Sequence, residues 1–152
     1  MHTDLFACGV TPDCDPLRLH LYPEPESALI CAAQLIHSNE PGALSSFFVP
    51  GGKVFETEQL IVLQGNGKAL VQSRHRECEI GSCPNPILWE PVSAHEICDV
   101  VLASDVAAGC AAMDDTKCRW SPWGSDALVN CVEVHDWSCD DVAAALGMQD
   151  SE

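Results

Sequence analysis

Histidine lies three or four positions before cysteine at three places in this chain, a pairing that suggests a metal centre. Imidazole nitrogen and thiolate sulfur are ligands that suit Zn²⁺, and four of them complete a tetrahedral site. None of the spacings matches a zinc finger, so disulfide bonding with exposed histidines is the competing interpretation. The residues concerned are His75, Cys78, His95, Cys98, His135 and Cys139.

Cys83, within the loop sequence at 81–84, is the best-placed cysteine for a catalytic nucleophile. A reactive thiolate needs a histidine base, which His75, His95 or His135 would have to supply. Nothing in the spacing brings these side chains together. We therefore assign no catalytic residue to this chain.

Carboxylate pairs occur at Glu56 and Glu58 and at Asp114 and Asp115. Glycoside hydrolysis uses two carboxylates placed several ångströms apart across a cleft. In a chain with 23 acidic residues, however, close pairs are expected mainly on the solvated surface.

Two segments are candidate binding surfaces: a short basic run at 74–76, which could be an anion site, a contact point or a solvated loop, and a segment with two tryptophans at 120–123, since aromatic and arginine side chains dominate binding surfaces. One begins an irregular stretch over 74–92 and the other lies in a polar loop over 113–126. For the second segment, the alternative is a loop anchored to the core by its tryptophans and tethered by Cys118. The candidate binding residues are Arg74, His75, Arg76, Lys117, Arg119, Trp120 and Trp123.

The chain has ten cysteines and no CxxC pair, which favours a disulfide framework over a metal cluster. Disulfides persist in oxidising compartments, so this count indicates secretion. The first residues lack the features of a secretion signal, which fits either a mature secreted form or a cytoplasmic protein with reduced thiols. The candidates are Cys8, Cys14, Cys31, Cys78, Cys83, Cys98, Cys110, Cys118, Cys131 and Cys139.

The formal net charge is −16, with only seven basic residues among 152. A surface this acidic repels nucleic-acid phosphates and anionic lipids, which argues against both as partners. The sequence has no apolar stretch long enough to span a bilayer. The charge is explained by solubility alone, by a cationic partner, or by a salty or acidic environment.

The elements that must position these residues follow from periodicity and from capping and turn signals. We expect one domain over 1–152, with an irregular arm at 1–16. Helices are predicted at 26–38, at 93–108 from the capping-box pattern of Ser93 and Glu96, and at 138–147. Strands are predicted at 17–22 and 127–135, with hairpins formed by 46–49 and 53–56 and by 59–63 and 68–72.

This order predicts an α+β fold: an antiparallel sheet with two helices on one face, in ferredoxin-like order, plus a short C-terminal helix. The cysteine-stapled arrangement over 8–139 resembles small cysteine-rich secreted proteins of fungi, of the effector and killer-toxin type. The cysteine pattern and the lack of a catalytic constellation lead us to expect a secreted, non-enzymatic protein that binds a partner protein through the loops around 74–92 and 113–126. Two alternatives stay open: an intracellular zinc-binding or cysteine-dependent enzyme, and a small acidic subunit of a larger assembly.

Overall fold

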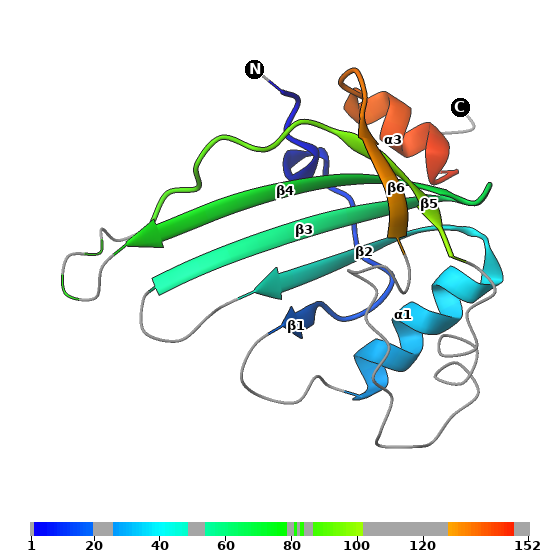
Figure 1. Ribbon diagram of the computed structural model, residues 1–152, viewed down its shortest axis with the longest axis horizontal. Helices are drawn as coiled ribbons and strands as arrows, with labels where there is room; N and C mark the ends of the chain where they lie inside the picture. The colour runs from blue at the N-terminus through cyan, green and yellow to red at the C-terminus, as the bar shows by residue number, and fades with distance from the viewer. Residues whose placement is uncertain are drawn as a thin grey trace.

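The computed structural model describes residues 2–19, 26–48, 54–78, 81, 83, 87–101 and 128–147. Their strands form one sheet in the order β1-β2-β3-β4-β5-β6 (Figure 1). β1 is parallel to β2, and every later pair is antiparallel, so β2 to β6 form a five-strand meander. The elements are η1 (Leu5–Cys8), β1 (Leu17–Leu19), α1 (Glu26–Ser38), β2 (Pro41–Phe48), β3 (Val54–Gln64), β4 (Lys68–Cys78), β5 (Glu96–Val100), β6 (Leu128–Glu133) and α3 (Cys139–Ala145).

The predicted ferredoxin-like order is wrong, because each strand from β2 to β6 pairs with the next strand along the chain. The main error was the helix expected at 93–108, whose residues 96–100 form β5 instead. The hydroxyl of Ser93 does not cap a helix; it accepts a hydrogen bond from the backbone N–H of Ser73 on β4 at 2.9 Å. Ile97 and Val100 are β-branched residues that fit a pleated strand, and pairing on both sides of β5 favours that state.

The hairpin of β3 and β4 is longer than expected, since both strands contain 11 residues. The irregular segment expected from 74 is therefore wrong for residues 74–78, which belong to β4. Residues 53–56, predicted to pair with 46–49, belong from Val54 onward to this same β3, which pairs with β2 as far as Phe48. The turn after Gln64 is as predicted, with positive φ at Gly65 and Gly67.

The helix α1 covers one face of the sheet, and its predicted bounds are confirmed. Its small side chains at Ala28, Ala32 and Ala33 are at most 2% exposed, which lets the helix lie close to the strands. This face packs against Leu44 and Ile61, among other strand residues.

The opposite face of the sheet is covered by η1 and α3. Leu5 from η1 and Val142 from α3 are fully buried against Leu60, Val62 and Leu70. The predicted capping box of α3 is present, with Ser138 and Asp141 exchanging hydrogen bonds. Both faces of the central strands are thus buried, which explains their continuous apolar runs.

Four disulfides link the eight cysteines of the described residues: Cys8–Cys139, Cys14–Cys31, Cys78–Cys83 and Cys98–Cys131. The first joins η1 to α3, the second joins the N-terminal segment to α1, and the fourth joins β5 to β6. Cys110 and Cys118 lie outside the described residues. Four bridges indicate an oxidising environment.

Candidate functional site

The outer half of the β3-β4 hairpin has two cross-strand ion pairs. The register places Glu58 opposite Arg74 and Glu56 opposite Arg76. Nε and Nη2 of Arg74 both donate to Oε2 of Glu58, at 3.1 and 2.8 Å. Arg76 forms the equivalent ion pair with Glu56. Charges directly opposite each other on one sheet face stabilise the strand pair and hold both guanidinium groups in place.

Trp89 lies against these guanidinium groups. The Cζ atoms of Arg74 and Arg76 are each 4.1 Å from the centroid of a Trp89 ring. Arg74 also lies over the ring of Phe6 at 4.3 Å. Each contact is a cation–π interaction, which is stronger where solvent is partly excluded. The aromatic and cationic groups therefore form one ordered cluster.

The segment that presents Trp89 runs beside the edge of β4. The backbone N–H of Glu90 donates to the carbonyl of His75 at 2.8 Å, and that of Ser93 donates to the carbonyl of Ser73 at 2.9 Å. These bonds give an irregular segment strand-like support. The position of Trp89 thus follows from backbone pairing as well as from its side-chain contacts.

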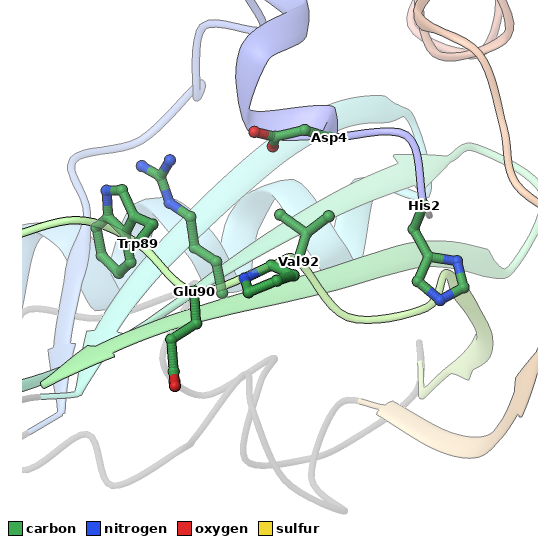
Figure 2. A pocket seen from close by; sticks show the side chains of 7 residues that line it. His2, Asp4, Trp89, Glu90 and Val92 are labelled. Carbon is green, nitrogen blue, oxygen red and sulfur yellow. The ribbon is translucent and has the colours of Figure 1, made fainter.

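A cavity of about 430 Å³ opens beside Trp89, and we call it the Trp89 pocket. Figure 2 shows Trp89 and His2 at opposite ends of the group of side chains, with Val92 between them. The N-terminal segment forms one wall, and the segment after Ile87 forms another. The lining residues are His2, Asp4, Arg74, Trp89, Glu90, Pro91 and Val92.

Acidic groups lie at the rim of the Trp89 pocket, while the positive charge of Arg74 is already paired with Glu58. Asp4 is exposed and accepts a hydrogen bond from the N–H of Phe6 at 3.0 Å, as the N-cap of η1. The carboxylate of Glu90 is 59% exposed and lies 3.4 Å from Nε2 of His75. Figure 2 shows Asp4 beside η1 and Glu90 below Trp89, so the two carboxylates lie on different sides of the group. A ligand in the pocket would therefore meet negative charge on two sides.

Buried polar side chains hold the N-terminal wall in position. Gln72 is fully buried and accepts from the N–H of Leu5 at 2.8 Å. Its amide donates to the carbonyls of Thr3 and Ser93, both at 2.9 Å. One side chain of β4 thus connects both walls of the pocket.

The same wall is fixed at His2 and Thr3 by Asp136. Nδ1 of His2 lies 2.9 Å from Oδ1 of Asp136, and the N–H of Thr3 donates to Oδ2 at 2.8 Å. The hydrogen bond from His2, followed by that from Thr3, holds the pKa of Asp136 below its ordinary value. The carboxylate is therefore in its ionised, accepting form at neutral pH.

The structure brings together only some of the residues proposed for binding. Arg74, His75 and Arg76 lie on β4, rather than in a loop, and Nδ1 of His75 lies 3.4 Å from the hydroxyl of Thr57. Lys117, Arg119, Trp120 and Trp123 lie outside the described residues. Trp89 was missed. Its one sequence signal is a large aromatic residue in a Pro-rich segment, which is also common in ordinary loops.

The three cysteines among the candidate zinc ligands are not available as thiolates. Cys78, Cys98 and Cys139 are disulfide-bonded, and Cys83, the nucleophile candidate, is the partner of Cys78. Within the described part of the chain, no group of three or more His, Cys, Asp or Glu side chains is arranged to hold a metal ion. Glu56 and Glu58 are paired with arginines, and Asp114 and Asp115 lie outside the described residues.

Comparisons with protein-family models, curated proteins and solved structures found no match to this chain. The cysteine-stapled arrangement that suggested fungal effectors and killer toxins is present among the described residues, but the sheet does not have the ferredoxin-like order expected with it. What remains is a small β-sheet protein with four disulfides among its described residues. No described helix combines the length and apolar character needed to cross a bilayer.

Proposed function

We propose that this chain is an extracellular, disulfide-stabilised binding protein that holds a segment of a partner protein in the Trp89 pocket. The observation that carries the proposal is the pre-arranged cluster of Trp89 on two guanidinium groups, beside an open cavity. The volume of about 430 Å³ is in the range of ordinary ligand pockets. Extracellular location is supported by the four disulfides.

The occupant that fits best is a lysine or arginine side chain of the partner. Its aliphatic stem would pack on Pro91 and Val92, because long cationic side chains bury their methylene groups against apolar surface. Its charged end would pair with Asp4 or Glu90 at the rim. The net charge of −16 adds long-range attraction for a basic segment.

The rigidity of the site favours binding. The contacts that order the site are present without a ligand. They are the hydrogen bonds of Gln72, the ion pairs between β3 and β4, and the backbone hydrogen bonds of Glu90 and Ser93. A pre-arranged site loses little conformational entropy when the partner docks. The partner segment therefore bears most of the ordering cost.

The test is selection of random displayed peptides on the oxidised protein, followed by affinity measurements on variants. We expect the selected peptides to contain a basic residue beside an apolar one. Val92→Arg places bulk and positive charge in the pocket and should weaken binding at least tenfold. Leu88→Arg, at a side chain 77% exposed on the same segment, is the matched control and should bind as the wild type does.

A second variant separates charge from structure at the rim. Asp4→Ser keeps an oxygen that can cap η1 but removes the negative charge. We expect lower affinity and a weaker dependence on salt than in the wild type. Selected peptides without basic residues, or equal binding by the Val92→Arg and Leu88→Arg variants, would contradict the proposal.

A further inference from the structure

A separate cavity of about 500 Å³ lies between the end of β3 and α3. We call it the Trp137 pocket, and it shares no lining residue with the Trp89 pocket. β3 contributes its last residue, the link between β6 and α3 contributes two, and α3 contributes three. The lining residues are Gln64, His135, Trp137, Asp141, Ala144 and Ala145.

Gln64 supplies an unsatisfied donor to this cavity. Its Nε2 is the one buried side-chain nitrogen or oxygen of the described residues that has no hydrogen-bond partner. Native proteins rarely keep such a group, because its lost hydration is not replaced. Because Gln64 also lines the Trp137 pocket, rotation of its amide toward an acceptor atom on a bound ligand would supply the missing partner.

Asp141 supplies a fixed acceptor on the other side. Its Oδ2 accepts from the backbone N–H of Ser138 at 2.8 Å, and its own N–H donates to the Ser138 hydroxyl at 3.1 Å. The backbone bond from Ser138, and then the hydroxyl bond, keep the pKa of Asp141 below its ordinary value. The residue is therefore an ionised acceptor at neutral pH, held in one orientation by the capping box.

Trp137 supplies an aromatic surface, and a hydrogen bond holds its backbone in place. Its N–H donates to Nδ1 of the fully buried His95 at 2.8 Å. The indole is half-buried against the core cluster of Leu5 and Val142. Ala144 and Ala145 also line the pocket, and their short side chains leave room for a ring.

From this arrangement we propose that the Trp137 pocket binds a neutral saccharide ring. A hydroxyl group is both donor and acceptor, so neighbouring hydroxyls can accept from Gln64 and donate to Asp141. The apolar C–H face of a pyranose can pack on the flat face of Trp137.

Charged ligands fit this cavity less well. An anion would be repelled by Asp141 and by a chain of net charge −16. A cation would leave the Gln64 donor without an acceptor. The combination of one orphan donor, one ionised acceptor and one aromatic face therefore selects hydroxyl-bearing ligands.

The experiment is a titration of the isotope-labelled, oxidised protein with cellotriose, chitotriose, mannotriose, xylotriose and galactose, followed by NMR. We expect at least one sugar to shift the side-chain amide signals of Gln64 and the indole signal of Trp137 in a saturable way. Trp137→Ala and Gln64→Leu should weaken that binding at least tenfold. Trp89→Ala removes an indole from the other pocket and should leave it unchanged.

Gln64→Leu has a second readout that does not depend on choosing the right sugar. Removing an orphan donor should raise the melting temperature of the free protein by several degrees, whereas removing a satisfied amide should lower it. Ala145→Leu fills the pocket on a helix that tolerates leucine and should abolish sugar binding in a folded protein. Absence of a saturable shift at Gln64 and Trp137 with all five sugars, or a lower melting temperature for Gln64→Leu, would overturn the proposal.

Discussion

The buried imidazole of His95 accepts a hydrogen bond at Nδ1 from the backbone N–H of Trp137, across 2.8 Å. Nε2 of the same ring lies 2.9 Å from the carbonyl of Thr3 and therefore carries the proton. One neutral tautomer satisfies both contacts, since Nδ1 must keep its lone pair. This ring thus joins the N-terminal segment to the segment that precedes α3, and each of those segments forms part of a pocket.

Replacing His95 should destabilise the protein strongly. His95→Leu leaves the buried N–H of Trp137 without its acceptor and removes a donor from the carbonyl of Thr3. We expect the free energy of unfolding to fall by about 2–4 kcal/mol. Urea unfolding measures this loss, with His135→Leu, at an exposed position, as the control of matched chemistry. Equal losses in the two variants would show that the buried hydrogen bonds are unimportant.

The disulfides should contribute unequally to the free energy of unfolding, because they close loops of different length. Cys8–Cys139 spans 131 positions and Cys78–Cys83 spans five. The chain-entropy model gives losses of about 5 and about 2 kcal/mol on replacing each pair by alanine. Unfolding of the two double variants under non-reducing conditions checks the order. A larger loss for the Cys78–Cys83 pair would contradict it.

Replacing Arg74 by lysine should destabilise the protein. Lysine keeps the charge but loses the two-pronged donation to Glu58 and the stacking on Phe6 and Trp89. We expect Arg74→Lys to cost about 1–2 kcal/mol and to change the fluorescence of Trp89.

The control for this substitution is the more exposed ion pair of Lys68 and Asp99 on the same sheet. Lys68→Met should change stability by less than about 1 kcal/mol, because exposed pairs contribute little. If both substitutions have the same small effect, the Arg74 cluster is not the rigid unit described above.

Acid should selectively weaken the attachment of the N-terminal segment to Asp136. The pKa of this carboxyl is lowered in the folded protein, chiefly by the hydrogen bond from His2 and then by that from Thr3. Its contribution to stability is therefore present above the unfolded value of about 4 and is lost as the pH falls through the lower folded value.

Measuring unfolding of wild type and Asp136→Asn from pH 6 to pH 2 tests this dependence. The difference between the two proteins should be present at pH 6 and should shrink below about pH 4. Asp15→Asn, at an exposed carboxylate near the same end of the chain, is the comparison. A difference between wild type and Asp136→Asn that stays constant over the whole range would refute the ionic origin of the contact.

Local signals in the sequence correctly predicted three features: α1, the turn at Gly65 and Gly67, and the capping box of Ser138 and Asp141. Each depends on residues within a few positions of one another. The strand at Glu96–Val100 could not be found this way, because its neighbours β4 and β6 decide its conformation. The Trp89 pocket depends on still longer separations, since Phe6 and Arg74 meet only after the N-terminal segment has folded back over β4.

The nearest-neighbour order of β2 to β6 has a consequence for how the chain folds. The connections from β2 to β3 and from β3 to β4 contain only five and three residues, so these hairpins close at low entropic cost, whereas 17 residues separate β4 from β5 and 27 separate β5 from β6. The N-terminal segment can dock only when β4 and the residues around Trp137 are in place. During oxidative folding, Cys78–Cys83, which closes only five positions, should therefore form early and Cys8–Cys139, which closes 131, should form last. Both pockets would then be completed at the final step of maturation, when the two ends of the molecule are joined.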